Sequence, residues 1–223
     1  MTEESISGHK ILEIPIFQLP NVVLFPNTFL PLHIFEPHYR NMVRKVLDPG
    51  QEVGMALLKQ PWNRQNRTQI FQVGGMGKIA ECLQLENGKF DVLLKGTSRF
   101  KLIKFLRHSP YPIGKVEILP EPQPHLEQAY RLTSSLVSSF GKLSEMATMN
   151  TKTEMLEDLD FQTLVNSICS SINISDYQKQ LLLEMNDLAH RADNLLKIID
   201  DLLVQQGLVE RFHHLRPKNP FYN

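Results

Sequence analysis

Cysteine is scarce in this sequence, and long apolar runs are missing from it. The two cysteines, Cys82 and Cys169, stand far apart without CxxC or CxxH spacing, which excludes a disulfide framework and a structural zinc site and predicts two buried free thiols. No apolar run approaches the roughly 18 residues of a membrane-spanning helix, and the polar, acidic N-terminus has no apolar signal core. We therefore expect a cytoplasmic protein.

The net charge of the chain is zero. The chain of 223 residues has 24 lysines and arginines against 24 aspartates and glutamates. A balanced chain has no global field to attract nucleic acid, an anionic membrane or acidic substrates, although a local patch remains compatible with it. The apolar content of 42% is enough to build a core.

The stretch from Ile14 to Val43 organises the rest of the sequence. It holds three apolar runs, Ile14–Ile16, Val22–Phe25 and Phe29–Ile34, and five prolines punctuate it. Proline cannot donate to a sheet ladder, so we expect these prolines at strand starts, strand edges and turns. Pro37 stands where a helix can begin. The pattern predicts three strands followed by a helix.

Alternating apolar residues continue after that helix, up to residue 119. Asn87-Gly88 separates two such runs, which is a strong hairpin signal, and Pro120, Pro122 and Pro124 mark a stiff linker. The further strands are expected within Val53–Leu58, Ile70–Val73, Gly77–Glu86, Phe90–Leu94, Phe100–Phe105 and Lys115–Leu119.

Beyond His125 the apolar spacing becomes helical. Three stripes follow, and the last one, Asp176–Gln206, is preceded by a capping box at Ser175-x-x-Gln178 and followed by Gly207 as a stop. One helix over that range measures about 45 Å. The predicted organisation is a disordered lead-in at 1–10, a β-rich barrel subdomain at 11–120, a helical subdomain at 125–207 and a tail at 208–223.

Short motifs of a distinctive kind are spread along nearly the whole chain. They are Leu19-Pro20-Asn21, Leu24-Phe25-Pro26, Ile34-Phe35-Glu36-Pro37-x-Tyr39, Val73-Gly74, Lys78-Ile79-Ala80, Gly96-x-x-Arg99-Phe100, Pro110-Tyr111-Pro112 and Leu182-Leu183-Glu184. Together they resemble the motifs of the Lon N-terminal domain family, the substrate-recognition domain of Lon proteases. The chain has Pro26-Asn27 where the family usually has Pro-Gly, but asparagine tolerates positive φ, so the same turn remains possible.

This resemblance implies an α+β fold, with a β-rich PUA-like pseudo-barrel followed by a C-terminal helical bundle with one long terminal helix. It also implies binding of unfolded or damaged polypeptides, or of a protease or chaperone partner, as an adaptor or holdase in protein quality control. As in the free-standing form of the family, no ATPase or peptidase domain is expected. The alternatives are an RNA-binding PUA-like module, which the zero net charge disfavours, and a hydrolase or peptidase.

Tests for chemistry give no catalytic, cofactor or metal site. The run from Gly74 to Lys78 lacks the first glycine and the Ser or Thr of a phosphate loop, and a strand follows it instead of a helix. The serines near Lys142 lack a nucleophile elbow, so we interpret them as helix surface. His33, Glu36 and His38 have HxxExH spacing, but Pro37 interrupts the helical turn that a metal site of this type needs.

The segment Lys59–Gln69 is the candidate binding site. It contains the only tryptophan, Trp62, together with Arg64 and Arg67. Tryptophan and arginine are typical of binding hot spots, and loops on a rigid scaffold often carry binding residues. We predict peptide binding by these three residues; the alternative is that Trp62 folds back as a lid on the sheet. We interpret Arg99 as a structural ion pair or turn brace.

Overall fold

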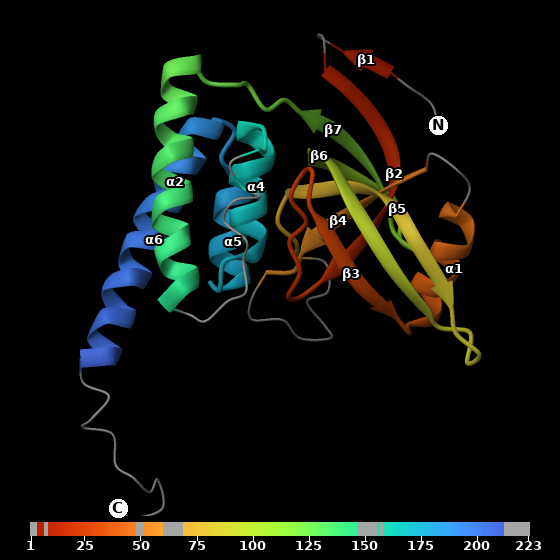
Figure 1. Cartoon of the computed structure of the whole chain (residues 1–223). Helices are drawn as coiled ribbons and strands as arrows, with labels where there is room; N and C mark the ends of the chain where they lie inside the picture. The colour runs from red at the N-terminus through yellow and green to blue at the C-terminus, as the bar shows by residue number, and fades with distance from the viewer. Residues whose placement is uncertain are drawn as a thin grey trace, which may run out of the picture.

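A computed structural model describes residues 4–6, 9–47, 51–59, 69–146, 156 and 158–211. A β-barrel and a helical bundle lie side by side in it (Figure 1). The predicted α+β fold, a β-rich pseudo-barrel followed by a C-terminal helical bundle, is confirmed.

The barrel is built from one seven-stranded sheet that closes on itself. β2 pairs with β4 in parallel, whereas the other pairs are antiparallel. The ring runs β2, β4, β5, β6, β7 and back to β2, with β1 and β3 attached outside it. The strands are β1 (Glu4–Ile6), β2 (His9–Leu19), β3 (Phe29–Ile34), β4 (Glu52–Leu57), β5 (Val73–Gln84), β6 (Phe90–Arg107) and β7 (Ile113–Leu119).

The length of β6 allows the ring to close. Its first part pairs with β3 and its second part with β7, while β5 follows it along the other side. Register shifts interrupt the β6–β7 pairing near Lys104 and the β5–β6 pairing at Met76/Gly77. Such bulges increase the local bend and twist that closure needs.

The glycines at the start of β5 let another backbone segment come close to the strand. A Cβ atom on Gly75 would lie 1.9 Å from the carbonyl oxygen of Leu24, so only glycine fits there. The bulge between Met76 and Gly77 agrees with the interpretation of this run as a bulged strand entry instead of a nucleotide loop.

The segment Val22–Phe25 is not a strand, so that prediction was wrong. Leu24 and Phe25 are fully buried, which explains the apolar signal, but the segment crosses the glycine-rich part of β5 without joining a ladder. At the following turn Asn27 has a φ of 62°, so asparagine does adopt the left-handed conformation there.

The N-terminal residues also differ from expectation. The sequence predicts a disordered lead-in over 1–10, whereas Glu4–Ile6 forms β1, which pairs with the start of β2 at His9. A three-residue strand is too short for an alternating pattern to reveal it.

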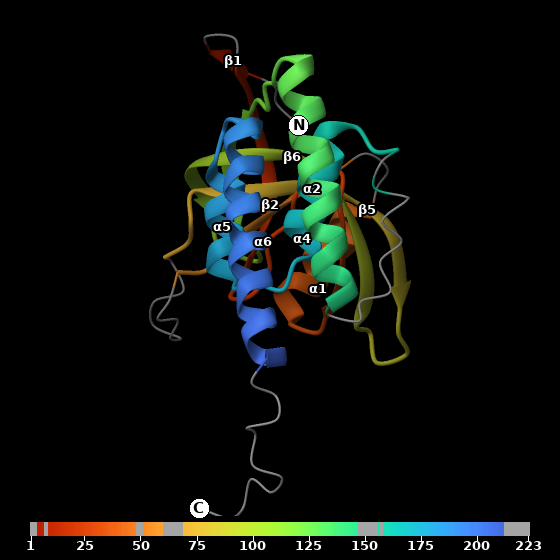
Figure 2. The same ribbon diagram turned by 60° about the vertical axis from the view of Figure 1, so that its left-hand side comes forward.

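The helices form α1 beside the barrel and a bundle after it. α4 and α5 lie between the barrel and the outer pair α2 and α6, and the last turns of α6 extend beyond the bundle (Figures 1 and 2). Gly207 does not stop α6, because glycine lowers helix stability without ending a helix. The helices are α1 (Pro37–Val46), α2 (Leu126–Met146), α4 (Phe161–Ser171), α5 (Asp176–Glu184) and α6 (Leu188–Arg211).

The long stripe from Asp176 forms two helices, so the single helix Asp176–Gln206 was wrong. The predicted capping box at Ser175 and Gln178 is present, but the chain breaks between Glu184 and Leu188. Two buried arginines supply partners for carbonyl groups at the break. Arg99 Nη1 donates to the Leu183 oxygen at 2.9 Å, and Arg191 Nη2 donates to the Met185 oxygen at 2.8 Å.

The same arginines join the barrel to the bundle through Glu121. Oε1 of Glu121 lies 2.6 Å from Arg99 Nε and accepts a hydrogen bond from Arg191 Nη2 at 2.7 Å. The Arg99 Nε contact is an ion pair without hydrogen-bond alignment. Burial, followed by the charge of Arg191, lowers the Arg99 pKa to about 10 although Glu121 opposes this. The interpretation of Arg99 as a structural ion pair is confirmed.

Apolar packing covers the same junction. Phe25 is fully buried within the core of the bundle, and Val23 and Val73 pack against that core. Gln180 on α5 donates to the carbonyl oxygen of Val73 at 2.9 Å.

Cys169 is buried in this core and Cys82 is partly exposed, so only one of the two predicted buried thiols is fully buried. Among the described residues no helix combines the length and apolarity needed to cross a membrane.

Candidate functional site

The candidate site is an apolar cleft at one end of the barrel, with a volume of about 600 Å³. Four connected regions form it: the end of β2 with the turn after it, the β3–α1 junction, the end of β4, and the β6–β7 connection. Eight of its twelve lining residues come from the Ile14–Val43 stretch. The lining residues are Gln18, Leu19, Pro20, Asn21, Phe35, Glu36, His38, Tyr39, Leu58, His108, Pro110 and Pro112.

Tyr39 fixes one wall of the cleft. Its hydroxyl accepts a hydrogen bond from the Gln18 amide at 2.9 Å and donates to the Gln18 carbonyl at 3.0 Å. Its ring contacts Phe17 in the barrel core, with centroids 4.9 Å apart. These contacts tie the first turn of α1 to the end of β2, so the wall is held in place without a ligand.

The lining is mostly apolar, and its rim is partly exposed. Phe35 is 58% exposed although it is a large apolar side chain, while Leu58 and Tyr39 are buried. Prolines 20, 110 and 112 add rigid apolar surface. A preformed concave surface of this kind suits an apolar side chain of a ligand.

Polar groups lie at the edge of the cleft. Oε2 of Glu36 lies 3.7 Å from Nε2 of His38, and the His38 ring packs on Tyr39 with centroids 4.0 Å apart. Glu36 precedes α1 but its side chain makes no capping hydrogen bond. His108 contacts Phe105, with ring centroids 4.8 Å apart. These groups can hydrogen-bond to the backbone of a bound ligand.

The residues with HxxExH spacing do not converge. His33 points to the outer face of the sheet and pairs with Asp91 at 2.7 Å, whereas Glu36 and His38 lie at the cleft. Within the part of the chain that the structure describes, no three His, Cys, Asp or Glu side chains are grouped to hold a metal ion.

The predicted peptide-binding residues Trp62, Arg64 and Arg67 lie outside the described residues. The two ends of their segment are described. The Lys59 amide donates to the Gln69 carbonyl at 2.8 Å, and the preceding Leu58 lines the cleft. The segment therefore leaves and rejoins the barrel next to the cleft.

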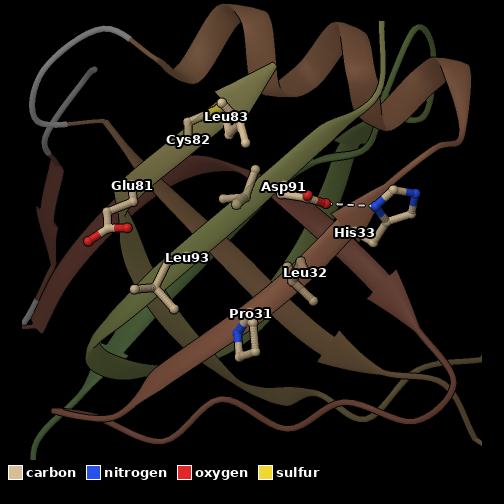
Figure 3. Close-up of a pocket in the computed structure, with 9 residues that line it drawn as sticks. Pro31, Leu32, His33, Glu81, Cys82, Leu83, Asp91 and Leu93 are labelled. Atoms are coloured by element: carbon tan, nitrogen blue, oxygen red, sulfur yellow. Dashed lines mark hydrogen bonds and ion pairs between the residues drawn. The ribbon is translucent and has the colours of Figure 1, made fainter. Parts of the chain in front are cut away.

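A second concave surface lies on the outer face of β3, β6 and β5 (Figure 3). Leu83, which is 62% exposed, and Leu93 lie there beside the His33–Asp91 pair. The register of the β3–β6 pair places Pro31 opposite Leu93 and His33 opposite Asp91. Charged and apolar side chains alternate across this face, as expected for the solvated side of a sheet.

Sequence reasoning did not single out the cleft residues as a site. Phe35, Tyr39, Pro110 and Pro112 stand within motifs that carry the family resemblance, but they belong to segments far apart in the sequence. The detectable signal was Phe35, an aromatic residue directly before Glu36-Pro37 at a strand-to-helix junction. Its exposure depends on how the β6–β7 connection folds, which no local pattern indicates.

The chain matches the family model of the ATP-dependent protease La (LON) substrate-binding domain over residues 13–201. Curated relatives are Lon proteases. The Lon protease of Parabacteroides distasonis is 28% identical over 196 residues, covering 84% of this chain and 24% of the relative. Lon protease 1 of Bdellovibrio bacteriovorus is 30% identical over 233 residues, covering 96% of this chain and 28% of the relative. The chain thus spans about a quarter of the length of these relatives.

Two solved structures share the fold. The N-terminal domain of the Mycobacterium avium complex Lon protease matches with a TM-score of 0.62 at 14% identity, over 86% of this chain and 98% of that one. A Lon N-terminal domain protein from Xanthomonas campestris matches with a TM-score of 0.57 at 19% identity, over 83% and 98%. The family match covers most of the sequence, and the architecture agrees with it. The chain belongs to the Lon substrate-binding domain family.

Proposed function

We propose that this chain binds polypeptide segments without cleaving them, and that an apolar side chain of the segment enters the cleft beside Phe35 and Tyr39. The observation that carries the proposal is the preformed apolar cleft with a half-exposed aromatic rim. The family name supports the ligand class, because it denotes a substrate-binding domain of a protease.

Unfolded polypeptides suit this cleft because they expose leucine and phenylalanine side chains that folded proteins bury. Full burial of one such side chain contributes about 1.5–3 kcal/mol. Such an anchor selects exposed apolar residues without requiring a defined sequence. This weak and general recognition fits an adaptor or holdase.

Addition of a peptide strand at the free edge of β3 is the less favourable mode. The Gly96 amide donates to the Thr28 carbonyl at 2.8 Å, and bonded positions alternate along an antiparallel pair. The backbone N–H and C=O groups of Leu30 and Leu32 therefore point toward β6. The backbone of Pro31 points toward the free edge, where proline has no N–H to donate. Proline on an edge strand discourages strand addition, so we place binding in the cleft.

Fluorescence anisotropy with a labelled, reduced and carboxymethylated unfolded protein tests this proposal. We expect saturable binding on the order of tens of micromolar, about three- to tenfold weaker in Phe35→Ala. The matched control is Leu126→Ala, because Leu126 on α2 is 86% exposed and remote from the cleft. The proposal fails if the unfolded protein does not bind, or if both variants bind as tightly as the unmodified chain.

A further inference from the structure

A basic groove adjoins the apolar cleft. It has a volume of about 770 Å³ and lies between the last turn of α1 and the β6–β7 connection. Three of its six lining residues are cationic and none is acidic. The lining residues are Asn41, Arg44, Lys45, Arg107, Pro110 and Tyr111.

Two of the cations are held in place by neighbouring groups. The Arg44 guanidinium lies 5.5 Å from the centre of the Phe90 ring and donates to Asn41 Oδ1 at 3.1 Å. The Arg107 guanidinium lies 5.4 Å from the centre of the Tyr111 ring, and the Tyr111 side chain is buried. Cation–π contacts fix guanidinium groups while leaving their N–H donors available.

The groove is locally unbalanced in charge. Among the described residues, no carboxylate pairs with Arg44, Lys45 or Arg107, and α1 contains no acidic residue in its ten positions. The chain as a whole has no net charge, so the cationic excess in the groove is local and is balanced by acidic residues elsewhere. Interface ion pairs in such a place set specificity and encounter rate more than affinity.

The groove and the apolar cleft are adjacent, because Pro110 lines both of them. Each residue of an extended peptide advances about 3.3 Å. A short segment with its apolar side chain in the cleft can therefore lay its next residues along α1, beside Arg44 and Lys45.

We propose that the chain prefers polypeptide segments in which acidic residues flank an apolar anchor, with the carboxylates bound by Arg44, Lys45 and Arg107. The inference rests on the proposed polypeptide binding and names its substrate class. Guanidinium groups bind carboxylates in bidentate geometry, which suits aspartate and glutamate side chains. Acidic residues are therefore the expected companions of the anchor.

The test compares two fluorescein-labelled peptides that share a phenylalanine anchor. In one, a run of glutamates follows the anchor; in the other, glutamines replace the glutamates. At low salt we expect the glutamate peptide to bind about tenfold more tightly, since exposed ion pairs contribute about 0.2–1 kcal/mol each. The difference shrinks as salt approaches about 1 M, where the screening length is about 3 Å.

Variants assign the effect to the groove. The triple substitution Arg44→Gln, Lys45→Gln, Arg107→Gln removes the preference for glutamate and leaves the glutamine peptide bound as before. A second variant, Arg44→Lys with Arg107→Lys, keeps the charge and retains part of the preference. The matched control removes three exposed cations from the bundle with Arg131→Gln, Lys142→Gln and Lys197→Gln, and keeps the preference.

Each other outcome has a definite meaning. If neither peptide binds, the polypeptide-binding function itself fails. If both bind equally, that function stands and the acidic preference is overturned. If a single-stranded RNA oligonucleotide displaces the glutamate peptide at lower concentration than the unlabelled peptide does, the groove is a nucleic-acid site and the proposal is overturned.

Discussion

Nε of Arg99 lies 2.6 Å from Oε1 of Glu121, with both side chains buried where the barrel meets the bundle. Arg191 donates to the same oxygen, and both arginines also bind carbonyl groups at the α5–α6 break. One carboxylate therefore compensates two buried cations. This arrangement makes Glu121 a central contact where the barrel meets the bundle.

Replacing Glu121 with glutamine is expected to lower the free energy of unfolding by about 3–5 kcal/mol, because it leaves two buried guanidinium groups without a counter-charge. Arginine keeps its proton at neutral pH, so Arg99 and Arg191 cannot escape this cost by becoming neutral. Urea denaturation followed by circular dichroism measures the effect. Glu127→Gln on the exposed start of α2 is the control, and equal stability of the two variants contradicts the assignment.

The glycines of the chain differ in what they require. Gly75→Ala is expected to destabilise the fold by about 1–3 kcal/mol, because its methyl group meets the Leu24 carbonyl. Gly207→Ala is expected to stabilise it by about 0.5–1 kcal/mol, since Gly207 lies inside α6 with no atom within 4 Å of an added Cβ. Thermal unfolding of both variants checks the opposite signs. A neutral Gly75→Ala result is incompatible with the close approach.

The two thiols are expected to react at very different rates. Burial raises the Cys169 pKa to about 12 and also raises that of Cys82, which is partly exposed. A raised pKa lowers the reactive thiolate fraction at neutral pH, so alkylation of Cys82 is slow there and accelerates as the pH rises. Cys169 reacts only on unfolding. Mass spectrometry after iodoacetamide treatment counts the labels, and a fast phase that survives Cys82→Ser is evidence against this assignment.

Trp62 remains a prediction from the sequence. Because Leu58 lines the cleft next to the start of its segment, we expect Trp62→Ala to weaken binding of unfolded protein by about tenfold, the usual scale of a hot-spot tryptophan. Anisotropy titration measures this loss, with unchanged thermal stability as the control. If stability falls and affinity does not change, the alternative interpretation of Trp62 as a structural lid is favoured.

Much of the fold was predictable because its signals are local. Most alternating runs, the Asn87-Gly88 turn and the Ser175–Gln178 capping box depend on neighbouring residues, and the structure contains them. Two of the expected strands differ: Ile70 forms only an isolated bridge ahead of β5, and Phe90–Leu94 and Phe100–Phe105 are parts of the single strand β6. The break between α5 and α6 was not predictable. It depends on Arg99, distant in sequence, binding carbonyl groups that a continuous helix needs for itself.

The candidate site was harder to predict because its residues are also far apart in the sequence. Phe35 and Pro110 are far apart in the sequence and meet only where the β6–β7 connection lies next to the β3–α1 junction. Val22–Phe25 has the composition of a strand but lies over Gly75, where close backbone contact replaces a ladder. Sequence patterns describe single elements, whereas the cleft depends on how four regions meet and the basic groove on how α1 meets the β6–β7 connection.

The most direct test of the central claim is photo-crosslinking of a peptide whose apolar anchor is replaced by benzoylphenylalanine, with the attachment sites mapped by mass spectrometry. The account predicts crosslinks to Leu19, Phe35 and Pro110 in the cleft, and their loss when unlabelled unfolded protein competes. Crosslinks concentrated on Leu83 and Leu93 would contradict it, because they would place polypeptide binding on the outer face of the sheet (Figure 3).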